Sequence, residues 1–110
     1  NGLAAWAAKG GITQPVVPPH CEHSWHLYHL LMPSLDARQR FIEHMRTRGA
    51  AAVFHYLPLH RSERGRRWAA TPASLPIVES AADRLVRLPM YNDMTDDDVG
   101  AVVEAASSWR

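Results

Sequence analysis

At residues 50–60 the chain reads Ala-Ala-Ala-Val-Phe-His-Tyr-Leu-Pro-Leu-His. Val53 and Phe54 are large apolar residues of the kind that favour a strand. Pro58 ends the strand, because proline has no backbone N–H to donate to a hydrogen-bond ladder. The pattern predicts a buried strand over residues 50–57, and the rest of the chain is interpreted around it.

Polar groups gather where this strand ends. His55, Tyr56 and His60 can all exchange protons or hydrogen bonds. The chain continues with four arginines, opposed in that segment only by Glu63, namely Arg61, Arg64, Arg66 and Arg67. One interpretation is the edge of a pocket for an anionic ligand. The other, which is commoner, is a core strand followed by a solvated basic turn, and the residues alone leave both open.

The segment before this strand predicts a further strand and a helix. Residues 23–32 are rich in aromatic residues and apolar on both faces, which predicts a central strand covered on both sides. Ser34 or Asp36 caps a helix that runs to Arg48, and Gly49 ends it. The order strand, helix, strand permits parallel pairing without requiring it.

The segment after the strand begins with a long connection. Residues 59–73 show neither helical nor strand periodicity, and the tryptophan within them indicates a loop that docks on another surface. Pro76 suits the start of a helix, and residues 86–88 form a short strand. Thr95 caps the last helix, with Asp98 at the fourth position of a capping box.

The N-terminal residues indicate a connection to another domain. Residues 1–12 are predicted to be the tail of a longer interdomain helix, since an Ala-rich run ends at a glycine pair and the chain starts at Asn rather than Met. Trp6 is expected to pack against structure outside the chain. Residues 13–22 form a Pro-rich linker and residues 23–110 the domain itself. Its predicted fold class is α/β in the broad sense (α+β), with about three strands packed against three helices.

Bulk composition excludes several classes of partner. A formal net charge of +1 gives no general attraction for nucleic acid or a membrane surface. No apolar run approaches the roughly 20 residues of a membrane span, and a single cysteine cannot form an internal disulfide, so the chain is expected to be soluble and cytoplasmic.

Four histidines lie near Cys21, namely His20, His23, His26 and His29. Their spacing does not fit a metal site, because His26 and His29 would point to opposite faces of a strand.

Four short motifs resemble, in the same order, the C-terminal part of the DegT/DnrJ/StrS sugar aminotransferases. They are Ser24-Trp25-His26-Leu27-Tyr28, Phe54-His55-Tyr56-Leu57-Pro58-Leu59-His60, Arg87-Leu88-Pro89-Met90-Tyr91 and Met94-Thr95-Asp96-Asp97-Asp98-Val99. The resemblance covers nearly the whole chain. Its Phe-His-Tyr-x-Pro-Leu-His form is most similar to enzymes that aminate the 4-keto group of a dTDP-4-keto-6-deoxyhexose.

The resemblance implies the small C-terminal domain of a fold-type-I aminotransferase. Enzymes of this family use pyridoxal 5′-phosphate (PLP), take the amino group from glutamate and act on a nucleotide-linked keto sugar. They are usually homodimers with active sites at the subunit interface, and their Schiff-base lysine and most cofactor ligands lie in the large domain. Lys9 is the only lysine here and cannot be matched to the Schiff-base lysine, so this chain is expected to be inactive alone.

The resemblance also implies candidate substrate-binding residues. It places His55 at the mouth of the sugar-nucleotide pocket, with Tyr56 and His60 as neighbours, although strand alternation would turn Tyr56 away from His55. Guanidinium groups suit the diphosphate, because each can bind two phosphate oxygens at once. Four are available, on Arg61, Arg64, Arg66 and Arg67. His26 and Tyr28 are expected in the core, and no catalytic, cofactor-binding or metal-binding residue is assigned.

Two alternatives to this enzymatic interpretation stay open. One is a stand-alone binding module for phosphorylated ligands that uses the basic segment after His60. The other is a catalytically dead family member with a regulatory role. The residue at the Schiff-base position, which lies outside this sequence, decides between that role and an active enzyme.

Overall fold

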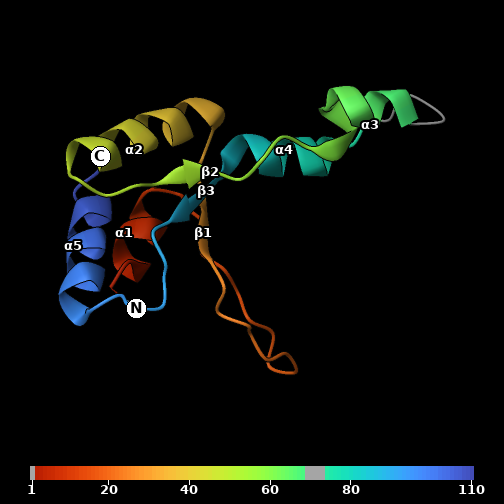
Figure 1. Ribbon diagram of the computed structural model, residues 1–110. Helices are drawn as coiled ribbons and strands as arrows, with labels where there is room; N and C mark the ends of the chain where they lie inside the picture. Colours follow the sequence, from red (N-terminus) through yellow and green to blue (C-terminus); the bar gives the residue numbers. More distant parts are fainter. Residues whose placement is uncertain (1, 69–73) are drawn as a thin grey trace.

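The computed structural model describes residues 2–68 and 74–110. The described chain contains three β-strands, five α-helices and one short 3₁₀ helix (Figure 1). In chain order they are α1 (Ala4–Lys9), β1 (Tyr28–Leu31), α2 (Leu35–Thr47), β2 (Val53–Phe54), η1 (Leu59–Arg61), α3 (Glu63–Trp68), α4 (Pro76–Arg84), β3 (Leu85–Leu88) and α5 (Asp96–Ser107). The predicted α+β class and its three strands are confirmed.

The three strands form one antiparallel sheet in the order β1-β3-β2. β3 lies in the middle, where Val86 is opposite both Leu30 of β1 and Phe54 of β2. The parallel pairing that a helical crossover would permit therefore does not occur. Each pair joins segments that lie far apart in the sequence.

The prediction of a central strand over residues 23–32 is wrong. Only Tyr28–Leu31 forms a strand, and it lies at an edge of the sheet, where Leu31 makes an isolated bridge to Thr13. Trp25 has a left-handed backbone (φ 49°), which a regular extended strand does not contain. The residues before β1 form a loop that projects from the body of the molecule (Figure 1).

β2 is much shorter than the buried strand predicted over residues 50–57. It contains only Val53 and Phe54, which are 44% and 49% exposed. It pairs with β3 on one side, and Tyr56 takes a left-handed conformation (φ 41°) that ends the extended run. The sheet is built around β3 instead.

One face of the sheet carries the hydrophobic core. Helices α1, α2 and α5 lie beside the sheet (Figure 1), and their buried side chains form one cluster with Leu30 and Val86. Burial of this apolar surface is the main source of stability. Trp6 packs against this core, contrary to the expectation that it packs outside the chain. Its ring centre lies 5.9 Å from that of Phe41, and its Nε1 donates a hydrogen bond to the Trp109 carbonyl oxygen (3.0 Å).

Three helices begin where the sequence predicts. The Ser34 hydroxyl caps α2 by accepting a hydrogen bond from the Ala37 amide (3.1 Å), and Pro76 is the first residue of α4. Thr95 and Asp98 form the capping box of α5, in which the Thr95 hydroxyl accepts from the Asp98 amide (3.2 Å) and the carboxylate accepts from the Thr95 amide (2.9 Å). These contacts are local in sequence, so local sequence predicts them.

Thr95→Ala is expected to lower the free energy of unfolding by about 1 kcal/mol, because the Asp98 amide at the start of α5 loses its acceptor. Urea denaturation followed by circular dichroism measures this change. Ser80→Ala is the matched control, because it removes a hydroxyl from an exposed position inside α4. Since alanine favours a helix more than serine does, this variant should be as stable as the native chain or slightly more stable. An equal loss in both variants would contradict the capping role.

η1, α3 and α4 form an arm that projects from the body of the molecule (Figure 1). The prediction of a connection without helices is wrong for residues 59–68, and residues 69–73 lie outside the described residues. Helices of 3 and 6 residues are too short to show a hydrophobic period. Trp68 ends α3 and is 79% exposed, so the described chain does not supply the docking surface expected for it.

Candidate functional site

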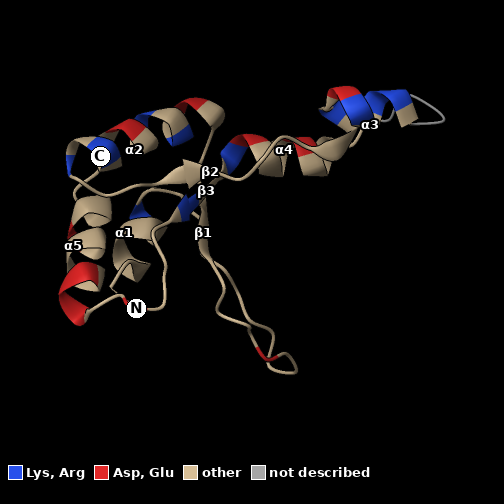
Figure 2. Ribbon diagram, viewed as in Figure 1, with Lys and Arg blue, Asp and Glu red and all other residues tan. Residues whose placement is uncertain are grey.

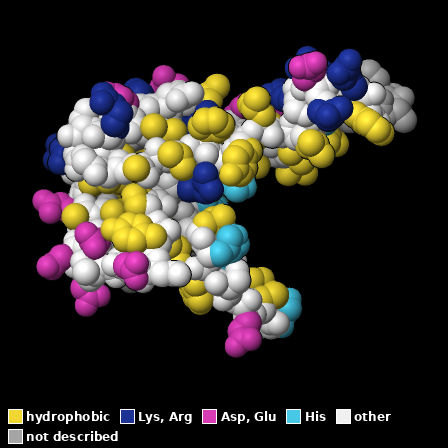
Figure 3. Space-filling model, viewed as in Figure 1, with side chains coloured by type: hydrophobic (Ala, Val, Ile, Leu, Met, Phe, Trp, Pro, Cys, Tyr) yellow, Lys and Arg dark blue, Asp and Glu magenta, His cyan; other side chains and the backbone are white. Residues whose placement is uncertain are grey.

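The face of the sheet opposite the core carries two polar side chains, those of His29 and Arg87, together with Leu31, Leu85 and Val53. Because side chains alternate along a strand, His29 and Arg87 point away from the face that buries Leu30 and Val86. In the strand register, Arg87 of β3 stands between His29 of β1 and Val53 of β2. Figure 3 shows basic and histidine side chains gathered where the arm meets the sheet, in the hollow between the arm and the loop before β1.

His55 and Tyr56 lie just beyond β2 and close to Arg87. The left-handed backbone of Tyr56 cancels the alternation that was expected to separate it from His55, so the two ring centres are 5.1 Å apart. The guanidinium carbon of Arg87 lies 5.4 Å from the centre of the Tyr56 ring, which is a cation–π contact. His29, His55, Tyr56 and Arg87 are called the open-face cluster below.

The open-face cluster is short of hydrogen-bond partners. His55 Nδ1 and Arg87 Nε are buried without a partner among the described residues. Burial lowers the pKa of His29, and the nearby His55 and His23 lower it further. No described carboxylate forms an ion pair with any member of the cluster. Since buried polar groups are nearly always hydrogen-bonded, the cluster is suited to receive an acceptor, and an anionic one best.

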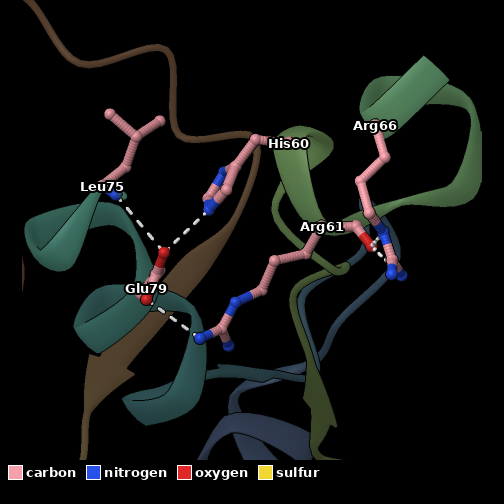
Figure 4. A network of polar contacts seen from close by, with 5 residues as sticks. All are labelled: His60, Arg61, Arg66, Leu75 and Glu79. Carbon is pink, nitrogen blue, oxygen red and sulfur yellow. Dashed lines mark hydrogen bonds and ion pairs between the residues drawn. The ribbon is translucent and has the colours of Figure 1, made fainter. Parts of the chain in front are cut away.

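A second polar group lies on the arm around Glu79 (Figure 4). His60 Nε2 lies 3.0 Å from Glu79 Oε1, and Arg61 donates to Oε2 at 2.9 Å. The Leu75 amide also donates to Oε1 (3.3 Å), and Arg66 donates to the Arg61 carbonyl oxygen (2.8 Å). The hydrogen bond from His60 is the main reason that the pKa of Glu79 is lowered, followed by that from the Leu75 amide. Glu79 therefore ties α4 to η1.

Glu79→Gln is expected to remove an acid-dependent change at the Leu75 amide. The pKa of Glu79 is lowered in the fold from its ordinary 4.5. The stabilising carboxylate contacts are therefore complete above about pH 4.5 and are lost as the pH falls through the lower folded value. A pH titration of the Leu75 amide by NMR should show this change in the native chain and not in the variant. Glu63→Gln, which alters the more exposed pair with Arg67 (3.9 Å), is the control. If it removes the change as well, the assignment to Glu79 is wrong.

The structure does not bring the five predicted substrate-binding residues together. The open face carries His55 and Tyr56, and the arm carries His60, Arg61 and Arg64. Sequence reasoning missed His29 and Arg87. Along a strand, side chains alternate between the two faces, so each of these residues is expected on the face opposite its buried neighbours. That His29 and Arg87 are cross-strand partners follows only from the pairing of β1 with β3.

The histidine-rich segment before β1 is mostly outside the core. His26 is exposed and hydrogen-bonded to Ser24, so the expectation that it lies in the core is wrong. Tyr28 is half-buried against the core and accepts a hydrogen bond from Gln14 (2.8 Å).

Nowhere in residues 2–68 and 74–110 do three or more His, Cys, Asp or Glu side chains gather as metal ligands would. None of the helices described combines the length and the apolar character needed to cross a bilayer.

Comparison with known proteins agrees with the family resemblance seen in the sequence. Residues 3–107 match the DegT/DnrJ/EryC1/StrS aminotransferase family. The chain belongs to this family. The resemblance seen in the sequence is thereby confirmed, and the open-face cluster lies within the matched region.

Two relatives show how much of a longer protein this chain represents. It is 35% identical over 100 residues to the uncharacterized protein MJ1066 of Methanocaldococcus jannaschii, covering 86% of this chain and 26% of that protein. It is 29% identical over 108 residues to dTDP-3-amino-3,4,6-trideoxy-alpha-D-glucose transaminase of Streptomyces venezuelae, covering 97% and 28%. The chain therefore spans little more than a quarter of these relatives.

A solved structure shows the same fold. DesV from Streptomyces venezuelae, determined in complex with a ketimine intermediate, superposes with a TM-score of 0.84 at 29% identity. The match covers 98% of this chain and 28% of the DesV chain. The sheet and the helices described above thus correspond to little more than a quarter of the DesV chain.

Proposed function

We propose that this chain is the C-terminal domain of a PLP-dependent aminotransferase that transfers an amino group from glutamate to a nucleotide-linked 4-keto-6-deoxy sugar. The family match over residues 3–107 is the observation that carries the proposal. The form of the Phe-His-Tyr motif supports 4-amination through the resemblance described above. The relative named as a dTDP-sugar transaminase supports a nucleotide-linked substrate.

In this proposal the chain shapes one side of the substrate site and does not hold the cofactor. PLP, when bound, supplies the electron sink for amino transfer. Lys9, the only lysine, is exposed in the last turn of α1 and is not part of the open-face cluster. Residues outside this chain therefore hold PLP, whereas His55 and Tyr56 contact and orient the sugar nucleotide.

The wider organisation belongs to the same proposal. Residues 1–12 are the end of an interdomain helix, residues 13–22 the linker and residues 23–110 the small domain. The complete polypeptide forms a homodimer in the cytoplasm, with the substrate site at the subunit interface. The open side of the sheet supports this arrangement, because it leaves polar side chains for a neighbouring surface to face (Figure 3).

His55→Ala in the complete polypeptide is expected to lower kcat/KM for the keto sugar about tenfold, because a hydrogen bond to a charged group is worth about 1.5–3 kcal/mol. The assay supplies glutamate and dTDP-4-keto-6-deoxyglucose and detects the amino sugar by chromatography. His26→Ala, at an exposed histidine, is the control and should leave kcat/KM unchanged. Absence of product from the native polypeptide would refute the proposed function. Equal losses in both variants would refute only the role of His55.

The 110-residue chain alone is expected to form no product with PLP, glutamate and the keto sugar, because its one lysine is exposed on α1. The complete polypeptide, assayed at the same concentration, is the positive control. Turnover by the 110-residue chain would show that the reactive centre lies within it.

A stand-alone binding module for phosphorylated ligands is the second candidate. It is favoured by the basic residues of α3 (Figure 2), of which Arg64 is exposed and forms no ion pair with a described carboxylate. Titration of a nucleotide sugar into the 110-residue chain separates the two candidates. Tight binding that needs no other part of the polypeptide favours the module, and weak binding favours the aminotransferase domain.

A further inference from the structure

We propose that Arg87 is the anion-binding side chain of the open face and that, flanked by His29 and His55, it binds an oxyanion of the substrates. The ligand chemistry is a phosphate or carboxylate group. The inference deepens the proposed function and rests on it for the source of the anion, which is either the diphosphate of the sugar nucleotide or a carboxylate of the amino donor. The sequence predicted that Arg61 and Arg64, on the arm, bind the diphosphate. This inference places the anion on the open face of the sheet instead.

Arg87 lies on the middle strand of the sheet. β3 is the middle strand and pairs on both sides, so the backbone at Arg87 is fixed by His29 on one side and Val53 on the other. The guanidinium group lies over the Tyr56 ring, at 5.4 Å from the carbon to the ring centre. Arg side chains lose much conformational freedom when they bind a ligand, and a fixed strand with an aromatic platform reduces that loss.

The charge of Arg87 is not satisfied within the described chain. Five ion pairs are described, and they involve Arg40, Arg46, His60, Arg61 and Arg67. Arg87 is in none of them, and its buried Nε has no hydrogen-bond partner among the described residues. Leaving a buried donor unpaired destabilises the fold, and more so for a charged group. An oxyanion that accepts from the guanidinium edge would remove this cost.

The neighbours of Arg87 also favour a negative group. His29 is its direct cross-strand partner, and two like charges in such positions destabilise a sheet. Burial and the nearby His55 and His23 keep the pKa of His29 low, so His29 stays neutral and can donate a hydrogen bond. The buried Nδ1 of His55 is the second unpaired polar atom of the cluster. Three nitrogen-bearing side chains thus lie on or beside the open face, and none of them forms an ion pair with a described carboxylate.

The arm, by comparison, already has its counter-ion. Glu79 accepts hydrogen bonds from Arg61 at 2.9 Å and from the Leu75 amide at 3.3 Å, and His60 lies 3.0 Å away. A phosphate group that bound Arg61 would have to displace or face this carboxylate. Arg64 also forms no ion pair with a described carboxylate, but it lies exposed on α3, whereas Arg87 is half-buried and its Nε is fully buried.

The test measures binding to the PLP-loaded complete polypeptide, with inorganic pyrophosphate as probe for the diphosphate and glutarate for the donor carboxylates. Arg87→Gln is expected to weaken binding of one of the two probes at least about tenfold, the effect of one lost charge-assisted hydrogen bond. Arg87→Lys keeps the charge and most of the stem, so it separates lost recognition from misfolding and should give an intermediate loss. Arg48→Gln, at an exposed site in the C-cap of α2, is the matched control and should bind as the native protein does.

Which probe responds identifies the source of the anion, and loss for either probe supports the inference. Native affinity of Arg87→Gln for both probes would overturn it, and so would a loss found only in Arg64→Gln. Turnover plays no part in this measurement. If Arg87→Gln weakens binding but the native polypeptide makes no amino sugar, the proposed function alone is refuted. If the native polypeptide makes amino sugar but Arg87→Gln binds both probes with native affinity, only this inference is refuted.

Discussion

Phe41→Ala is expected to lower the free energy of unfolding by about 3–5 kcal/mol, a large part of the stability of a domain of this size. Phe41 is 0% exposed. Its ring lies 5.9 Å from that of Trp6 on α1 and 5.8 Å, edge to face, from that of Trp109 after α5. The truncation therefore removes the contact that holds both chain termini against α2, and it leaves a cavity that the rigid rings cannot fill.

Phe54→Ala is the matched control, since it is the same chemical change at the only other phenylalanine. Phe54 is 49% exposed and lies on the two-residue edge strand. The expected loss is about 1 kcal/mol, because little apolar area is returned to water. Denaturant unfolding of both variants, followed by tryptophan fluorescence, gives the comparison. Similar losses in the two would mean that α1 and the C-terminus do not depend on Phe41.

Gly65→Ala is expected to disrupt the arm, with a local loss of about 3 kcal/mol, at the upper end for overpacking. A methyl group at this position would overlap the carbonyl oxygen of Leu59 and also crowd the Ser62 hydroxyl. The obstacle is backbone, so it cannot move aside as a flexible side chain would. η1 and α3 would have to separate, and the amides of residues 59–67 should lose protection against hydrogen exchange while the sheet keeps its own.

Gly100→Ala provides the opposite control. Nothing lies within 4 Å of a methyl group built at this position in the middle of α5. Alanine is better than glycine inside a helix by up to about 1 kcal/mol, so this variant should be more stable than the native chain. If Gly65→Ala were as stable as Gly100→Ala, the close packing of α3 against η1 would be wrong.

The helix boundaries show what local sequence can specify. Ser34, Pro76 and the pair Thr95 and Asp98 each act within four residues of where they stand. The hydrogen bonds they make depend on backbone geometry that any chain with those residues can adopt. These starts were therefore predictable, as was the family, because motif order is a property of the sequence alone.

The strands show where local reasoning failed. Residues 50–57 have a strong strand composition, yet only Val53 and Phe54 pair. Residues 85–88 are no more apolar, yet they occupy the middle of the sheet. Whether a strand lies at the edge or in the centre of a sheet depends on which distant segments pair with it. The composition of a short segment does not contain that information.

The candidate site divides in the same way. The sequence by itself determined the family, the α+β class, the capped helix ends and the presence of His55 and Tyr56 near a basic segment. Only the tertiary structure decided that Arg87 stands beside Tyr56, that His29 is its partner, and that Glu79, 18 residues beyond Arg61, already engages that arginine. The physical reason is that caps and motifs are satisfied by neighbours along the chain, whereas the charge balance of a site is set by groups that meet only once the chain has folded.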